Sequence, residues 1–166
     1  MDDFFELSVV DFKQYTPVLE SVNICEVVCE EILSSYLVFK NKGITPLFEQ
    51  ADEQIFVLAD KKLLTRVVQN LISNGIKYSA GQMEFLITVG GCVTLSVSNS
   101  VSQSVDTEKI FDKFYRSDLS RKGEGAGPGL YICRKLAEEM NGKITAKNSN
   151  GKLTITVEFK RYDIHS

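Results

Sequence analysis

Two amide side chains and an ammonium group recur along one predicted helix, at Asn70, Asn74 and Lys77. At 100° per residue these three side chains span about 60° of the helix circumference, so they share one face at the rim of its apolar stripe. Asparagine carbonyls suit Mg²⁺ when phosphate supplies other ligands, and a lysine neutralises phosphate charge. The same spacing also fits asparagines that bond the backbone beside a solvated lysine, so both interpretations stay open.

A glycine-rich stretch, Gly123 to Gly129 (GEGAGPG), leads directly into another predicted helix. Such a turn lets phosphate oxygens approach backbone N–H groups, and the helix N-terminus adds unpaired donors with a partial positive charge. A flexible connector before a helix started by proline explains the same letters. The stretch is neither a Walker A loop nor a Rossmann fingerprint, because no Gly-Lys-Ser/Thr follows it and no strand precedes it. Together with the polar helix face, it favours a site for a nucleotide phosphate tail.

The composition argues against several other chemistries. The single histidine, His165, lies one residue from the C-terminus, which disfavours a Ser-His-Asp triad, a multi-histidine metal site and a histidine general base. A net charge of −3 implies no basic surface for nucleic acid. Cys25 and Cys29 are predicted to be small buried residues of one helix face, because no C-x-x-C pair or further zinc ligands accompany them. No secretory signal or apolar run of about 20 residues occurs, which favours a reducing cytosolic setting.

Hydrophobic periodicity predicts the elements that position these residues. The predicted helices are Val22 to Tyr36, continuing to a glycine cap near Lys42-Gly43; Lys61 to Ser79, with Asp60 as N-cap; and Pro128 to Met140. The predicted strands are Ile44 to Phe48, at a sheet edge because of Pro46; Gln54 to Ala59; a hairpin of Phe85 to Val89 and Val93 to Val97; Lys143 to Lys147; and Leu153 to Phe159. About three main helices on a mixed, mostly antiparallel sheet of five or so strands make a two-layer α/β sandwich.

Three motifs, in order and correctly spaced, resemble those of one family. Asn70 to Ser79 (NLISNGIKYS) resembles the N-box of sensor histidine kinases, Ile110 to Asp118 (IFDKFYRSD) their F-box, and Gly125 to Leu130 (GAGPGL) their second glycine box. The resemblance extends from about Thr16 to Lys160 and is to the GHKL superfamily, whose Bergerat-type ATP-binding fold is an α/β sandwich. It implies a catalytic domain over residues 16–162, after an N-terminal extension or linker remnant at 1–15 and before a tail at 163–166.

The resemblance also implies roles for the residues of the N-box. Asn74, helped by Asn70, would hold a Mg²⁺ ion that bridges the phosphates of ATP. Lys77 would contact phosphate, and Tyr78 would pack beside the adenine. These residues would make the predicted helix the wall that carries the metal and the phosphate charge.

The other two motifs imply a lid over the nucleotide. Arg116 and Arg121 would lie in this lid, at about residues 100–125, and would reach the γ-phosphate. Phe111 and Phe114 would anchor the lid to the core, and the rest of it is expected to be mobile because it has few apolar anchors. The implied turn under the phosphates consists of Gly125, Gly127, Gly129 and the adjoining Leu130.

The sequence departs from the family pattern in three places. Most such kinases carry an Asp-x-Gly-x-Gly box after the central hairpin, whose aspartate reads the adenine amino group. Asn99 occupies that position within Ser98 to Gln103, and no glycine follows it. An asparagine carbonyl still accepts a hydrogen bond from the adenine amine, without the assistance of charge. Gly75 replaces the usual alanine of the N-box, and Pro128 replaces the usual leucine of the glycine box.

Asn70 distinguishes a kinase from an ATPase within the resemblance. Related ATPases place a glutamate at this position to activate water, and an amide is not a general base at neutral pH. The resemblance therefore implies a histidine kinase that transfers the γ-phosphoryl group of ATP to a histidine in a separate dimerisation domain. Implied partners are that domain and, indirectly, a response regulator of a two-component system. The implied setting is a cytoplasmic domain, not itself membrane-inserted, of a membrane-anchored sensor protein.

Two alternatives come from other functional classes. One is a degenerate GHKL domain with weak or no nucleotide binding that acts as a protein-interaction module; the missing glycines after Asn99 motivate it. The other is a cytosolic GHKL ATPase or serine kinase, which Asn70 and the kinase-like F-box disfavour. Binding of Mg-ATP separates the first alternative from the kinase, and rapid turnover would identify the second.

Overall fold

The computed structural model describes residues 15–79, 81–101, 105–112 and 129–163. Four helices and seven strands occur within these residues. In chain order they are β1 (Glu20–Asn23), α2 (Ile24–Ser34), α3 (Tyr36–Lys42), β2 (Thr45–Phe48), β3 (Phe56–Ala59), α4 (Lys61–Tyr78), β4 (Gln82–Val89), β5 (Val93–Ser100), α5 (Gly129–Glu139), β6 (Lys143–Ser149) and β7 (Lys152–Arg161). Within these described ranges, no helix has the length and hydropathy that crossing a membrane requires.

The strands form one mixed sheet in the order β1-β3-β7-β5-β4-β2, and β6 pairs with β7 outside this path. β2 runs parallel to β4, whereas the neighbouring pairs β4–β5, β5–β7 and β6–β7 are antiparallel. The edge position of β2 agrees with Pro46, which has no N–H to donate to a further strand. The predicted two-layer α/β class with a mostly antiparallel sheet is confirmed.

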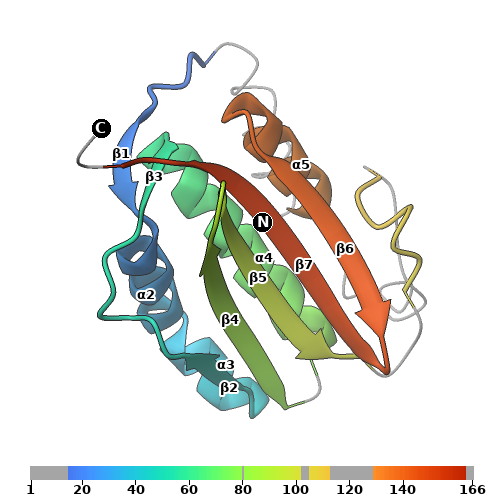
Figure 1. Cartoon of the computed structure of the whole chain (residues 1–166). Helices are drawn as coiled ribbons and strands as arrows, with labels where there is room; N and C mark the ends of the chain where they lie inside the picture. Colours follow the sequence, from blue (N-terminus) through green and yellow to red (C-terminus); the bar gives the residue numbers. More distant parts are fainter. Residues whose placement is uncertain (1–14, 80, 102–104, 113–128, 164–166) are drawn as a thin grey trace.

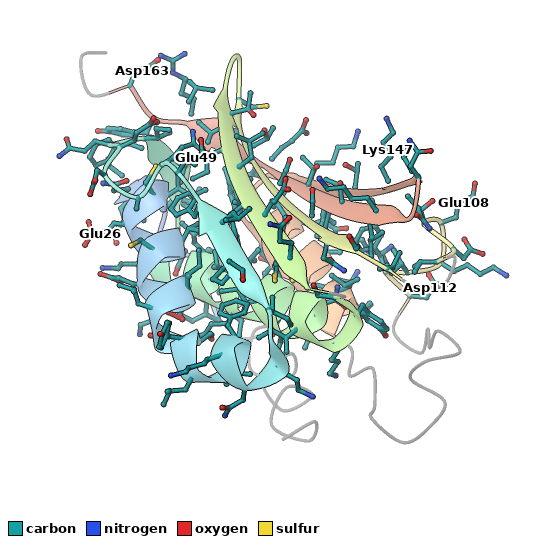
Figure 2. All side chains as sticks on the ribbon, turned by 90° about the horizontal axis from the view of Figure 1, so that it is seen from below. Glu26, Glu49, Glu108, Asp112, Lys147 and Asp163 are labelled. Carbon is teal, nitrogen blue, oxygen red and sulfur yellow. The ribbon has the colours of Figure 1, made fainter. Side chains whose placement is uncertain are left out.

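The helices α2, α4 and α5 cover one face of the sheet. Figure 1 shows α4 crossing behind β5 and β7 with α2 and α5 on either side of it, and Figure 2 shows this helical layer beneath the sheet. The inward residues of β5 and β7 alternate with half-exposed ones, and the inward set is fully buried against the helices. On the opposite face, hydroxyl groups pair across strands, as at Ser96 and Thr156 (3.1 Å) and at Ser98 and Thr154 (2.9 Å).

The start of α4 is set by the N-cap that the sequence predicts. Oδ1 of Asp60 accepts hydrogen bonds from the backbone N–H groups of Lys62 (2.9 Å) and Leu63 (3.2 Å), which have no partner inside the helix. The carboxylate is 3% exposed although it is charged. Since α4 carries the predicted N-box, this cap fixes where each of its residues lies on the helix.

The first predicted helix was wrong in two respects. Val22 and Asn23, where the helix was predicted to begin, belong instead to β1 (Glu20–Asn23) beside β3, and the Asn23 side chain caps α2 by accepting from the Cys25 N–H (3.1 Å). The helix is also interrupted at Ser35, so the expected single element is α2 followed by the short α3. Its predicted end is confirmed, because Gly43 takes a left-handed φ of 68°. Strand pairing is a long-range contact that local periodicity does not contain, which explains the extra strand.

Candidate functional site

The polar residues predicted on α4 become more exposed toward its C-terminal end. Asn70 is 2% exposed, Asn74 is half-buried and Lys77 is exposed. Lys77 lies in the last turn, where the negative end of the helix dipole favours a cation. The expected rim position therefore holds for Asn74 and Lys77, whereas Asn70 lies inside the core. Tyr78, the last residue of α4, is half-buried.

Asn70 lies in the contact between α4 and α5. Burial raises the pKa of the Cys133 thiol on α5 well above its usual range, and the neighbouring Asn70 side chain partly offsets that increase. The thiol stays protonated and points to the backbone carbonyl of Val67, with 3.6 Å between sulfur and oxygen. Within the described residues, Nδ2 of Asn70 is buried without any hydrogen-bond partner. A buried donor in this state costs about 1–3 kcal/mol, so the nitrogen of this carboxamide is a polar atom that the described residues do not satisfy.

Asn99 occupies a buried position on β5 and faces the helices. Its side chain is 3% exposed, and its Nδ2 donates to the adjacent Ser100 carbonyl over a long 3.4 Å. Met83 of β4 and Leu153 of β7 are its direct partners across the two neighbouring strands. A carboxamide buried between two fully buried apolar side chains is unusual, because buried polar groups ordinarily have good hydrogen-bond partners.

Gly75 brings the N-box helix into close contact with the strand beside Asn99. A Cβ atom added at Gly75 would collide with Cε of Met83 and lie 2.8 Å from its sulfur. The thioether of Met83 therefore occupies the space that an alanine methyl would take. This contact places Asn74, one residue before Gly75, on the helix that covers the Asn99 strand. The sequence pattern singles out Gly75 but not Met83, for which the replaced alanine at residue 75 is the only signal.

The glycine box meets the described structure where α5 begins. Gly129 is half-buried as the first residue of α5, and Leu130 is 6% exposed and belongs to the core. α5 packs along α4, so the residues that open α5 belong to the same helical layer as the N-box. The other predicted residues of this loop and of the lid lie outside the described residues: Arg116, Arg121, Gly125, Gly127 and Phe114.

The segment after β5 is anchored to the core at the start of the predicted F-box. Ile110 is 5% and Phe111 7% exposed, so the expected anchoring by Phe111 is confirmed. The segment lies beside β6, because Nδ2 of Asn148 reaches the Val105 carbonyl at 3.5 Å. Figure 2 shows Glu108 and Asp112 of this segment at the same end of the molecule as Lys147 of β6. The described part of the predicted lid, residues 105–112, is therefore packed against the core through Ile110 and Phe111.

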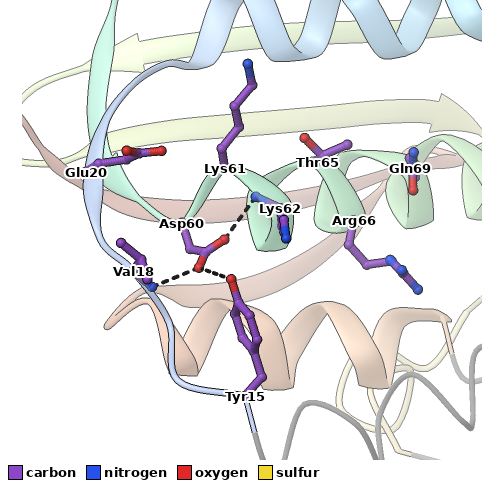
Figure 3. A pocket seen from close by; sticks show the side chains of 9 residues that line it. All are labelled: Tyr15, Val18, Glu20, Asp60, Lys61, Lys62, Thr65, Arg66 and Gln69. Atoms are coloured by element: carbon purple, nitrogen blue, oxygen red, sulfur yellow. Dashed lines mark hydrogen bonds between the residues drawn. The ribbon is translucent and has the colours of Figure 1, made fainter.

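A cavity of about 710 Å³ lies at the other end of α4. Figure 3 shows the Asp60 carboxylate at its wall, with Oδ2 accepting from the Tyr15 hydroxyl and from the Val18 N–H, both at 2.8 Å. Lys62 and Arg66 from the first turns of α4 also line it. None of the predicted site residues that the structure describes lines this cavity. It lies between the segment before β1, with Tyr15 and Val18, and the first turns of α4, away from Asn70, Asn74 and Lys77.

Known proteins resemble this chain in sequence. Residues 59–163 match the family described as "Histidine kinase-, DNA gyrase B-, and HSP90-like ATPase". The sensor histidine kinase WalK of Bacillus subtilis (strain 168) is 30% identical over 172 residues, covering 96% of this chain and 28% of that protein. The sensor histidine kinase YcbM of the same organism is 25% identical, covering 97% of this chain and 54% of that protein.

A solved structure agrees in fold. The catalytic domain of histidine kinase ThkA superposes with a TM-score of 0.76 at 26% identity, covering 87% of this chain and 96% of that one. This chain spans between about a quarter and a half of the two curated relatives, as their covered shares of 28% and 54% state. The matched range includes α4, β5 and α5, which carry Asn74, Asn99 and Gly129. The chain belongs to the histidine kinase-, DNA gyrase B- and HSP90-like ATPase family.

Proposed function

We propose that this chain is the ATP-binding catalytic domain of a sensor histidine kinase. It transfers the γ-phosphoryl group of ATP to a histidine in a separate dimerisation domain, within two-component signal transduction. The carrying observation is that the Gly75–Met83 contact brings the helix of Asn74 over the strand of Asn99. Phosphoryl transfer depends on positioning and charge neutralisation, which amides, a lysine and helix-terminal N–H groups supply.

The residues present fit Mg²⁺ and a nucleotide. Asn70 and Asn74 are four residues apart on one helix face, and the carboxamide of Asn70 is not locked by a hydrogen bond from its nitrogen. Asn74, helped by Asn70, would hold the ion, which neutralises phosphate charge when bound. Lys77 adds a further positive charge at the end of α4. On the base side, the buried Asn99 carboxamide accepts from the exocyclic amine of adenine and so selects the base.

The reaction class, phosphoryl transfer and not hydrolysis, follows from the absence of a general base at residue 70. A carboxamide does not take a proton from water at neutral pH, so bound ATP is protected from hydrolysis and kept for transfer. The remaining parts of the proposed site are Tyr78 beside the base, Gly129 and Leu130 at the start of α5, and Arg116, Arg121, Gly125 and Gly127 in the lid. The proposed catalytic domain covers residues 16–162, in the cytoplasmic part of a membrane-anchored sensor that acts through a response regulator.

Titration with Mg-ATP, followed by calorimetry, tests the proposal. Asn74→Ala should weaken affinity about tenfold or more, because hydrogen bonds and ligands to charged groups contribute about 1.5–3 kcal/mol. Gln69→Ala is the matched control on α4, since Gln69 is exposed and its Nε2 bonds Glu31 outside the site (2.7 Å). Unchanged affinity in Asn74→Ala would overturn the metal assignment, and turnover as fast as a dedicated ATPase would overturn the argument from Asn70.

One observation favours a second function, a degenerate domain that binds partner proteins. Large apolar side chains are exposed together at the junction of α2 and α3: Leu33 (66%), Tyr36 (58%), Leu37 (68%) and Val38 (47%). A contiguous exposed apolar patch often marks a protein interaction site. The degenerate domain is favoured if wild type fails to bind Mg-ATP at millimolar concentration while Asn99→Asp binds it.

A further inference from the structure

Met83 and Gly75 are fitted to each other between β4 and α4. Met83 is completely buried, and its terminal Sδ and Cε atoms fill the volume next to the Gly75 backbone. An alanine methyl at residue 75 would overlap Cε and lie 2.8 Å from Sδ, closer than any stable contact. The end of a methionine side chain is flexible, so a methyl group there would displace the thioether without breaking the helix.

Met83 also lies directly beside the proposed base-reading amide. Met83, Asn99 and Leu153 are opposite one another on the adjacent strands β4, β5 and β7. Side chains opposite each other in antiparallel strands project from the same face, with Cβ atoms about 4.5–5.5 Å apart. The contact of Met83 with Gly75 shows that this face points to α4. Asn99 is therefore bordered by a thioether on one side and by the isobutyl group of Leu153 on the other.

We propose that Met83 is a specificity-determining residue of the nucleotide site, held by Gly75 in position to contact the purine beside its exocyclic amine. This inference rests on the proposed nucleotide function, because it takes Asn99 as the group that reads that amine. A polarisable thioether makes favourable contacts with aromatic ring edges. It also closes the β4 side of Asn99, so the site excludes purines that carry a substituent on the amine nitrogen.

Competition between two nucleotides on the whole chain measures this role. The probes are Mg-ATP and Mg-N6-benzyl-ATP, whose benzyl group extends the exocyclic amine. Wild type should bind ATP and reject the benzyl analogue. Met83→Val shortens the side chain and keeps a residue suited to a strand, so the preference for ATP over the analogue should fall about tenfold or more.

Leu153→Val is the matched control. Leu153 is as buried as Met83 and pairs with Asn99 from the opposite strand, so this change also shortens a core side chain next to the same amide. It should leave the preference for ATP within about twofold of wild type, because the three atoms nearest to a Cβ at Gly75 all belong to Met83 and none to Leu153. A loss of general stability would lower both affinities together, which the ratio of the two affinities does not register.

Gly75→Ala provides an independent variant. Alanine favours the helix, so thermal stability should not fall, whereas the displaced thioether should change the ATP affinity and its ratio to the analogue. Adding Met83→Val removes the overlapping atoms and should return the ATP affinity toward that of Met83→Val alone. The role of Met83 is overturned if wild type binds ATP and both Met83→Val and Gly75→Ala leave the ratio of the two affinities unchanged. It is also overturned if Leu153→Val changes this ratio as much as Met83→Val does. Failure of wild type to bind ATP overturns the proposed function instead.

Discussion

The hydroxyl of Tyr15 donates a 2.8 Å hydrogen bond to Oδ2 of Asp60, a residue 45 positions later in the chain. The same oxygen accepts from the Val18 N–H, while Oδ1 caps α4. One carboxylate thus joins the segment that enters the domain to the first turn of the helix that carries the proposed metal ligands. Burial raises the pKa of Asp60, but the hydrogen bonds from Val18, Tyr15 and the helix N–H groups outweigh it, and the pKa of Asp60 is lowered overall.

The lowered pKa of Asp60 predicts a loss of stability in acid. The folded pKa lies below the ordinary value of about 3.9, so the folded state binds the proton less readily than the unfolded state. The stabilisation is present above about pH 4 and is lost as pH falls through the folded pKa. Asp60→Ala should lower the free energy of unfolding by about 0.5–2 kcal/mol for the cap alone. Urea unfolding from pH 7 to pH 2.5 should show the difference between wild type and variant shrinking only below pH 4.

Asp60→Asn separates the two roles of Asp60: the N-cap of α4 and the attachment of the entering segment through Val18 and Tyr15. Asparagine keeps an oxygen for the α4 N–H groups but presents an amide nitrogen to the Val18 N–H, where a donor faces a donor. We expect this variant to retain α4 and to lose the attachment of the entering segment. If the free energies of unfolding of wild type and Asp60→Ala differ by a constant amount down to pH 2.5, Asp60 is not the titrating group.

Tyr15→Phe should raise the pKa of the Asp60 carboxyl toward its ordinary value, because one of its donors is removed while the Val18 bond remains. The hydrogen bond to Asp60, followed by burial, also raises the pKa of Tyr15 itself. The contribution of the Tyr15 hydroxyl to the free energy of unfolding is therefore complete below about pH 10. It is lost as pH rises through the raised pKa of Tyr15 in the folded state. Carboxyl titration by NMR measures the first effect, and thermal unfolding between pH 8 and pH 11 the second. An unmoved Asp60 titration in the variant would contradict the attachment through Tyr15.

Gly142→Ala should destabilise the domain by about 1–3 kcal/mol, because overpacking forces backbone displacement. A Cβ at this position would collide with the Glu158 carbonyl of β7 and lie 3.2 Å from the Ala137 carbonyl. The N–H of Gly142 closes the end of α5 by donating to the same Ala137 carbonyl at 2.7 Å. Gly91→Ala is the control, since nothing lies within 4 Å of a Cβ there and its effect should stay within about 0.5 kcal/mol. Equal effects of the two substitutions in urea unfolding would exclude the steric explanation.

Asn70→Leu should increase stability and reduce nucleotide binding. The substitution removes a buried donor that has no partner in the described residues, which should add about 1–3 kcal/mol to the free energy of unfolding without nucleotide. It also removes an amide from the proposed metal face, so affinity for Mg-ATP should fall. Unfolding by urea and calorimetric titration measure the two quantities on the same sample. A variant that is less stable than wild type would mean that Asn70 is satisfied within the fold.

Much of the fold follows from local pattern. Alternation along β5 and β7 predicted their buried faces, and the spacing of apolar residues predicted α4 within one residue of its end. The polar face of α4 was likewise readable, because helical geometry fixes which residues share a side. The N-cap at Asp60 and the left-handed Gly43 were predicted from residue type alone and are confirmed.

Other features depend on contacts between distant segments. Local pattern could not show that Glu20–Asn23 pairs with β3, that Asn70 lies inside the core, or that Met83 fills the space above Gly75. The sequence by itself therefore determined the family and the class of fold, and it supplied the residue types of the proposed site. The tertiary structure alone decided how deep each side chain lies and which side chains border Asn99. The reason is physical: periodicity encodes the direction in which a side chain leaves its own element, whereas burial and contact depend on the element that packs against it.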